Sequence, residues 1–117
     1  MQMNETSFGT AQPVDGYGPG FFRVAGRPMH GPICLANEGS VAWGGLHDED
    51  ALLRLVPDVD VIFVGTGAEM TYLPKTLTDR LASAGVGVEV MNTPSACRTY
   101  NVLLGEGRRV ALAALPV

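Results

Sequence analysis

The sequence predicts a single α/β domain, in which a mixed β-sheet is flanked by helices and preceded by a β-rich N-terminal part. Short apolar runs divided by turn residues fill the first half of the chain. From residue 59 to residue 115, apolar strands alternate with helical repeats of apolar residues, which is typical of an α/β arrangement. A chain of 117 residues fits one domain, which we expect to span residues 14–117. Residues 1–13 have little periodicity and are expected to form a flexible arm.

The β-rich part is expected to contain three short strands. They are Phe21–Val24, Ile33–Ala36 and Val41–Trp43. Segments rich in Gly, Pro, Asn and Asp precede and separate them, at Asp15–Gly20, Ala25–Pro28 and Asn37–Ser40. Because such residues favour turns, the three strands are predicted to form an antiparallel unit.

Two helices are indicated in the middle of the chain. Asp48 is the expected cap of a helix over Ala51–Val56, and Pro57 is expected to end it. Four apolar residues at helical spacing mark the second helix: Leu73, Leu77, Leu81 and Ala84. Pro74 suits the first turn of this helix, and Gly85 suits its end.

A third helix is expected to begin with Thr93 as its cap and Pro94 in its first position, and to run to about Leu104. Apolar strands are expected at Val59–Val64, Val86–Met91 and Arg109–Leu115. A strand–helix–strand crossover makes the first two of these strands parallel. Their C-terminal ends then place Gly65–Gly67 beside Asn92 and Thr93, at the edge where open α/β sheets bind ligands.

The turn formed by Gly65, Thr66 and Gly67 lies between a strand and a helix, as a phosphate-binding loop does. The dinucleotide pattern requires a third glycine at position 70, where this chain has Met70. A tight strand-to-helix turn is therefore the favoured interpretation. The alternative is a site for a small anionic ligand, which this turn and the helix start at Thr93 would hold.

The third helix carries the remaining candidate residues: Cys97, Arg98 and Asn101, followed by Glu106 and Arg108. Arg98 and Asn101 share one helix face because they are three positions apart. Glu106 could pair with Arg98 or Arg108 and fix the helix end, or these groups could form a surface for a partner or ligand. Arg98 would be the clamp for an anion.

The two cysteines, Cys34 and Cys97, are not in a paired motif and are expected to be reduced thiols in a core. A nucleophilic Cys97 would need a base, and nothing in the sequence places either His30 or His47 beside it. Neither a metal site nor a cofactor is indicated. The net charge of −4 argues against nucleic acid. No apolar run is long enough to span a membrane, and no secretory or transit pattern is present, so a cytoplasmic location is expected.

Several motifs resemble one family. They are Phe63–Gly67, Val88–Thr93, Ala96–Leu103 and Glu106–Ala111, with Tyr17–Val24 and Trp43 in the first half. The family is the domain-of-unknown-function family that includes mitochondrial complex I assembly factor three and the adipogenesis-associated domain protein. The resemblance covers about residues 14–117 and implies an α/β domain with a mixed sheet and a β-rich N-terminal addition. It implies no catalytic role for any motif residue.

The leading hypothesis is a non-enzymatic protein-binding or assembly-factor-like module, with Arg98 and its neighbours as the contact surface. It follows from the resemblance and from the lack of a complete catalytic set. The alternative is a small-molecule binding protein or enzyme that uses the cleft at Gly65–Gly67 and Thr93–Arg98. A bacterial protein with an unidentified protein partner is expected, and the β-rich half could support a homodimer.

Overall fold

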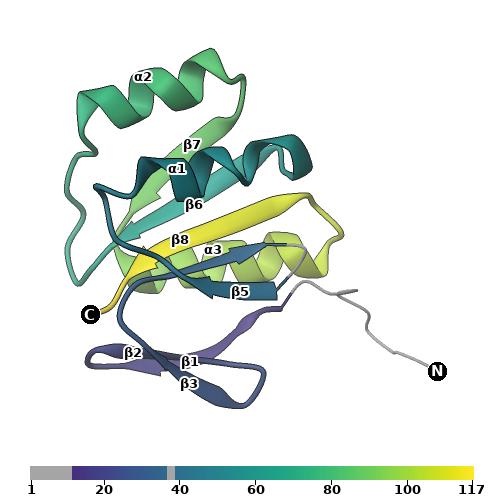
Figure 1. The fold of residues 1–117 in the computed structure, drawn as a ribbon. Coiled ribbons are helices and arrows are strands. Elements are labelled where there is room, and N and C mark those ends of the chain that lie inside the picture. Colours follow the sequence, from purple (N-terminus) through teal and green to yellow (C-terminus); the bar gives the residue numbers. More distant parts are fainter. Residues whose placement is uncertain (1–11, 37–38) are drawn as a thin grey trace.

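The computed structural model describes residues 12–36 and 39–117 (Figure 1). Most of the arm expected at residues 1–13, and the expected turn residues Asn37 and Glu38, lie outside these ranges. The strands are β1 (Val14–Gly18), β2 (Phe21–Val24), β3 (Arg27–His30), β4 (Ile33–Ala36), β5 (Gly39–Ala42), β6 (Val61–Thr66), β7 (Gly87–Met91) and β8 (Val110–Leu115). The helices are α1 (Glu49–Leu53), the short 3-10 helix η1 (Val56–Asp58), α2 (Lys75–Ser83) and α3 (Thr93–Gly105).

The strands form two sheets. A three-stranded antiparallel sheet contains β1, β2 and β3, and a five-stranded sheet has the order β5-β4-β8-β6-β7. In the larger sheet, β6 runs parallel to β7 and β8, whereas β4 runs antiparallel to β5 and β8. The predicted α/β class with a mixed sheet is therefore confirmed.

Helices α2 and α3 are the crossover connections of the parallel strands. Helix α2 joins β6 to β7, and α3 joins β7 to β8. The predicted pairing of β6 with β7 is confirmed, with Gly65 opposite Met91 at the C-terminal end. This end of the sheet lies at the start of α3, as the sequence predicted.

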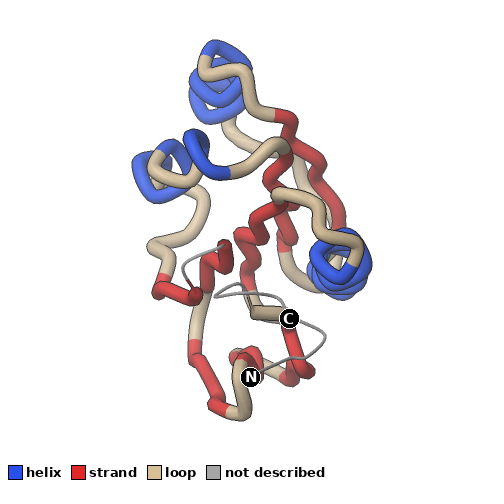
Figure 2. Tube along the Cα trace, turned by 90° about the vertical axis from the view of Figure 1, so that its right-hand side faces the viewer, coloured by secondary structure: helices blue, strands red, loops and turns tan. Residues whose placement is uncertain are grey.

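The five-stranded sheet separates two apolar cores. Figures 1 and 2 show the helices that lie on its two faces. Helices α1 and α2 pack on one face, and α3 packs on the other together with the three-stranded sheet. Strand β8 supplies both cores, because successive side chains of a strand point to opposite faces. Its residues Val110, Leu112 and Ala114 join α3, whereas Ala111 and Ala113 join α1 and α2.

The predicted β-rich unit is only partly right. The hairpin of β4 and β5 is present, but β2 pairs with β1 and β3 in a separate sheet. Strand β1 occupies Val14–Gly18, where the glycines predicted a turn, because this segment is held between β2 and α3. Strand β3 contains Pro28, which has no N–H to donate. An edge strand tolerates a proline because one side of its backbone has no neighbouring strand to bond.

The helix starts also differ from the predictions. Asp48 lies at the N-cap of α1, but its carboxylate accepts from the N–H of Gly44 and makes no side-chain cap bond. Helix α1 ends at Leu53, and Pro57 belongs to η1. The cap of α3 is Asn92, whose Oδ1 accepts from the N–H of Ser95 at 2.9 Å. Thr93 is the first residue of α3, and its hydroxyl has other partners.

Candidate functional site

The turn after β6 is closed by its own hydrogen bonds. The hydroxyl of Thr66 donates to the carbonyl oxygen of Glu69 at 2.9 Å and accepts from the N–H of Thr71 at 2.9 Å. Gly67 has φ +99°, a conformation that side chains other than glycine rarely adopt. The turn is therefore a tight strand-to-helix turn, as predicted, with its polar groups bonded internally.

Thr93 ties this turn to the start of α3. Its hydroxyl accepts from the N–H of Gly67 at 2.8 Å and donates to the carbonyl oxygen of Leu115 at 2.6 Å. Its own N–H donates to the carbonyl oxygen of Gly67 at 2.7 Å. A Cβ added to Gly65 would lie 2.8 Å from the Thr93 hydroxyl and 2.9 Å from its Cα. The predicted juxtaposition therefore exists, but the two segments are in direct contact and the Gly67 N–H is already used.

Cys97 and Cys34 are buried free thiols, as expected. Burial raises the pKa of Cys97 to about 12. Burial also raises the pKa of Cys34 to about 12, with a smaller raising contribution from Asp48 and an opposing one from Arg54. Both thiols are protonated at neutral pH, and a protonated thiol is a poor nucleophile.

Asn101 has a structural role that the sequence did not reveal. Its side-chain Oδ1 accepts from the N–H of Val14 at 2.8 Å, and its Nδ2 donates to the carbonyl oxygen of Val14 at 2.8 Å. The neighbouring Tyr100 hydroxyl donates to the carbonyl oxygen of Gln12 at 2.9 Å. Helix α3 therefore holds β1 by its backbone.

A groove of about 280 Å³ lies between β1 and α3. It is lined by Val14, Asp15, Gly16, Tyr17, Pro94, Cys97, Arg98, Asn101 and Val102. We call it the β1–α3 groove. Arg98 is exposed at this groove, and two large side chains beside it are also exposed, Tyr17 by 43% and Val102 by 54%. Tyr17 was not among the candidate residues, because only the fold brings β1 next to α3.

Among the described residues, the structure shows no ion-paired end of α3, which was one of the two interpretations of these groups. Arg98, Glu106 and Arg108 make no ion pair with another described residue. Arg98 and Glu106 are eight positions apart, which is about 12 Å along a helix axis. Arg109 is the neighbour that forms a pair, with Asp60 at 3.1 Å. The structure therefore brings Cys97, Arg98 and Asn101 to one groove and leaves Glu106 and Arg108 outside it.

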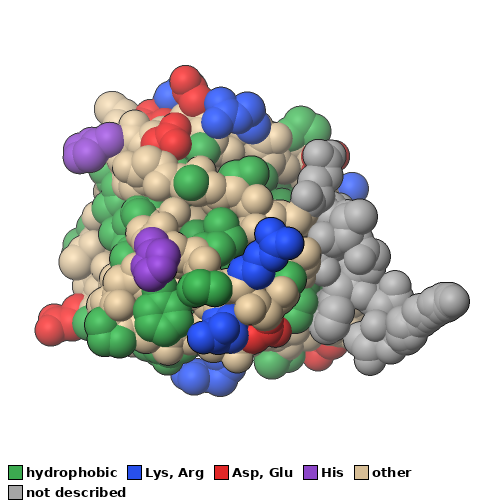
Figure 3. All heavy atoms as spheres, turned by 60° about the horizontal axis from the view of Figure 1, so that its bottom comes forward, with side chains coloured by type: hydrophobic (Ala, Val, Ile, Leu, Met, Phe, Trp, Pro, Cys, Tyr) green, Lys and Arg blue, Asp and Glu red, His purple; other side chains and the backbone are tan. Residues whose placement is uncertain are grey.

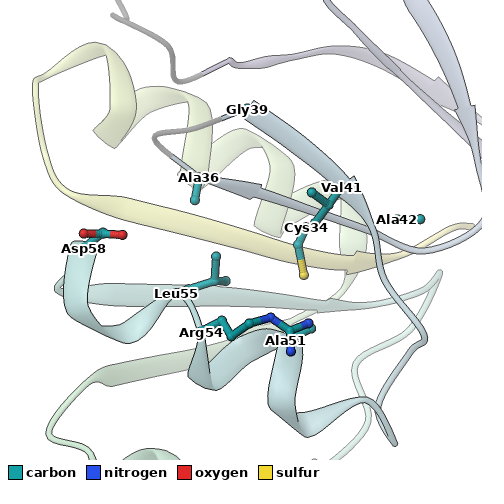
Figure 4. Close-up of a pocket in the computed structure, with 9 residues that line it drawn as sticks. All are labelled: Cys34, Ala36, Gly39, Val41, Ala42, Ala51, Arg54, Leu55 and Asp58. Atoms are coloured by element: carbon teal, nitrogen blue, oxygen red, sulfur yellow. The ribbon is translucent and has the colours of Figure 1, made fainter.

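A second hollow, of about 380 Å³, lies between the β4–β5 hairpin and the α1–η1 segment (Figure 4). Its walls are Cys34, Ala36, Gly39, Val41, Ala42, Ala51, Arg54, Leu55 and Asp58. Most of these side chains are small and apolar, with Arg54 and Asp58 as the charged members. Such residues form no recognisable motif, so the sequence did not predict this hollow.

Two further features concern the part of the chain that the structure describes. No three His, Cys, Asp or Glu side chains of this part gather in a way that could hold a metal ion. None of its helices has the length and apolarity needed to cross a membrane.

The family model described as protein of unknown function (DUF498/DUF598) matches residues 14–115. The chain belongs to this family. An uncharacterised protein of Rhodobacter capsulatus is 47% identical over 117 residues, which cover 100% of this chain and 94% of the relative. The Danio rerio protein named NADH dehydrogenase (ubiquinone) 1 alpha subcomplex assembly factor 3 is 31% identical over 99% of this chain and 70% of its own length. The predicted resemblance is confirmed.

Solved structures of similar proteins show the same fold. One is described as an outer membrane protein from Bartonella henselae, with 32% identity, a TM-score of 0.84, and coverage of 95% of this chain and 99% of that chain. Another is a Bordetella pertussis protein described as a Mth938-like domain, with 28% identity and a TM-score of 0.78. Its alignment covers 99% of this chain and 92% of that chain. The fold of this DUF498/DUF598 domain is thus shared along almost its whole length.

Proposed function

We propose that this domain is a non-enzymatic protein-binding module of the assembly-factor type, and that the β1–α3 groove around Arg98 is its contact surface. The similarity to a protein named as an assembly factor, over 99% of this chain, supports a role in protein contacts. The choice of this surface rests on the groove between β1 and α3. There an exposed arginine, Arg98, stands beside the exposed side chains of Tyr17 and Val102.

Most of the other candidate residues have structural contacts. Gly65, Thr66, Gly67 and Thr93 form the closed junction of β6, β8 and α3. Asn101 is bonded to β1, and Cys97 is buried. Arg98 is the one of these residues that is exposed at the groove and has no ion pair to another described residue. Tyrosine and arginine are also enriched among the residues that dominate protein–protein binding.

The alternative of a small anionic ligand at Gly65–Gly67 and Thr93–Arg98 is not favoured. An anion would need free N–H groups at the turn and at the helix start. The N–H groups of Gly67, Thr93 and Ser95 already donate to protein oxygens. The contact of Gly65 with Thr93 leaves no room between the two segments.

The test is affinity capture of the tagged full chain at native abundance, read by mass spectrometry. Arg98→Glu and Val102→Lys are expected to lose a stoichiometric partner, because both change the groove surface. Val41→Lys is the matched control: Val41 is exposed by 58%, close to Val102 at 54%, but it lies on β5. Retention of the partner by all three variants, or capture of no partner by the unchanged protein, would overturn the proposal.

A cytoplasmic location, a homodimer, and independence from cofactors and nucleic acid stay predictions. The same capture experiment addresses two of them, because its eluate also shows whether nucleic acid and a second, untagged copy of the chain accompany the tagged protein.

A further inference from the structure

The charges of the chain are distributed unevenly over the fold. Residues 44–85, which contain α1 and α2, have seven acidic residues and three basic ones. The acidic residues are Asp48, Glu49, Asp50, Asp58, Asp60, Glu69 and Asp79, and the basic ones are Arg54, Lys75 and Arg80. This segment therefore has a net charge of −4, from seven negative and three positive groups.

The elements around the β1–α3 groove have the opposite sign. Arg98 is the one charged residue of α3, and the three-stranded sheet carries Arg23 and Arg27 against the single acid Asp15. Three arginines and one aspartate give these elements a net charge of +2, in a chain whose total is −4. Figure 3 shows the side of the molecule that lies at the bottom of Figure 1, where basic, histidine and some acidic side chains stand among hydrophobic ones.

The acid in the groove wall has a contact of its own. The Oδ2 atom of Asp15 accepts from the N–H of Gly26 at 3.1 Å, in the turn between β2 and β3. Arg23, which is exposed, lies opposite Gly16 on the neighbouring strand. Its neighbours Phe22 and Val24 point into the core with α3, so the Arg23 side chain lies on the outer face of the three-stranded sheet, away from the groove. A carboxylate of an incoming chain therefore meets Arg98, on a helix that has no acidic side chain.

The groove also has an apolar part. Tyr17 and Val102 are exposed large side chains, and Pro94, at the start of α3, is half-buried in the same wall. An apolar side chain placed among them would remove apolar surface from water on both sides of the contact. The site thus combines an apolar position with a positive neighbour.

A second copy of this chain does not suit this surface. In a two-fold dimer the same patch meets itself, so the Arg98 side chains of the two copies would lie in one interface and repel each other. A head-to-tail contact between the basic and acidic sides would not close on two copies and leads to an open assembly or a larger ring. The charge distribution therefore favours a different protein as the occupant.

Resting on the proposed function, the geometry points to the class of partner: we propose that the β1–α3 groove binds an acidic segment of the partner protein. One apolar side chain of that segment lies between Tyr17 and Val102, and its carboxylates face Arg98. The acidic side of the domain repels the same segment, so the charge distribution orients the encounter as well as the bound state.

The chemistry is tested with three synthetic peptides and the ¹⁵N-labelled full chain. The first peptide contains Glu, Leu and Phe, the second has Lys at every Glu position, and the third has Ser at every Leu and Phe position. We expect the first peptide to shift the backbone amide signals of Tyr17, Arg98 and Val102 and to bind about tenfold more tightly than either of the others. Its affinity is expected to fall as salt is added, because salt screens exposed charges.

A charge reversal provides the internal control. Arg98→Glu is expected to weaken binding of the Glu peptide and to strengthen binding of the Lys peptide. Arg54→Glu, on the other side of the sheet, is expected to leave the preference for the Glu peptide unchanged. Equal binding of the Glu and Lys peptides would overturn the proposal. So would the same amide shifts with a single-stranded oligonucleotide or a phosphatidylserine vesicle and none with the Glu peptide, since the groove would then bind another class of anion.

A cross-link separates this inference from the proposed function. A photoreactive phenylalanine analogue at position 17 is activated while the partner is bound, and the cross-linked segment is sequenced by mass spectrometry. An acidic segment with an apolar residue is expected. If Val102→Lys loses the partner but the cross-linked segment is neutral or basic, the protein-binding function stands and the acidic class is wrong. If no partner is captured, the proposed function fails, and the peptide measurements still decide the chemistry of the groove.

Discussion

The thiols of Cys34 and Cys97 lie in the two cores on opposite faces of the five-stranded sheet. Each was a candidate for chemistry from its residue type alone, and its surroundings determine what it does. Because an apolar core stabilises the neutral thiol over the thiolate, the pKa of each is raised from an ordinary 9.0 to about 12. At the residue scale, both cysteines are therefore parts of the core.

These pKa values give a pH dependence of stability. Between pH 9 and 12 the unfolded chain loses its thiol protons while the folded chain keeps them, so the unfolded state binds fewer protons. The free energy of unfolding then decreases as pH rises. We expect the contribution of Cys34 and Cys97 to stability to be complete below pH 9 and to decline above it, as measured by urea unfolding in a pH series. A Cys34→Ala, Cys97→Ala double variant should show a weaker decline, and an identical slope would contradict the assignment.

Gly65 and Thr93 show what could be predicted at this scale. Their proximity followed from the order of strands and helices, because the C-terminal end of β6 had to meet the start of α3. The hydrogen bonds within this contact could not be predicted. The sequence could not show that the Thr93 hydroxyl would bond Gly67 and Leu115 and leave the capping of α3 to Asn92. Such choices depend on distances that only the packed chain sets.

At the scale of elements, β1 is held by a side chain that acts like a neighbouring strand. The carboxamide of Asn101 bonds both the N–H and the carbonyl oxygen of Val14, as the backbone of a paired strand would. Val14 is 6% exposed, so water has little access to replace these bonds. The orientation of β1, and with it one wall of the β1–α3 groove, depends on this contact.

Asn101→Ala is expected to lower the free energy of unfolding by about 1–3 kcal/mol, because it leaves two backbone groups of Val14 without partners. It is also expected to speed hydrogen exchange of the Val14 amide. Val102→Ala, an exposed neighbour on the same helix, should change stability by less than about 0.5 kcal/mol. Urea unfolding and amide exchange measure both effects, and unchanged exchange at Val14 would contradict this role of Asn101.

The same scale explains why the two halves of the chain differed in predictability. The segment from β6 to β8 has strands that are apolar along their length and helices with apolar residues at regular spacing, and these patterns determine the elements locally. Strand β1 contains Gly16 and Gly18, and β3 contains Pro28, so local preference opposes both strands. They are strands because β2 lies between them and α3 binds the outer edge of β1.

At the scale of the whole molecule, the two cores depend on a common strand. Strand β8 lies between β4 and β6, and its alternating side chains enter both cores. Leu112 is fully buried in the core with α3, and Trp43 is 3% exposed in the core with α1 and α2. If the core on one face is disrupted, β8 moves, and its side chains then no longer pack in the core on the other face. The two cores should therefore unfold together, as one cooperative unit.

Trp43 is the single tryptophan, so its fluorescence reports on one core alone. Leu112→Ala removes buried side-chain volume from the opposite core and is expected to lower the free energy of unfolding, measured through Trp43, by about 2–5 kcal/mol. Leu77→Ala, in the Trp43 core, should cause a loss of similar size. Cores that unfold separately would give a shift of the Trp43 transition with Leu77→Ala and none with Leu112→Ala. Equal shifts, with far-UV circular dichroism following the same curve, are the result expected if β8 couples the core with α1 and α2 to the core with α3.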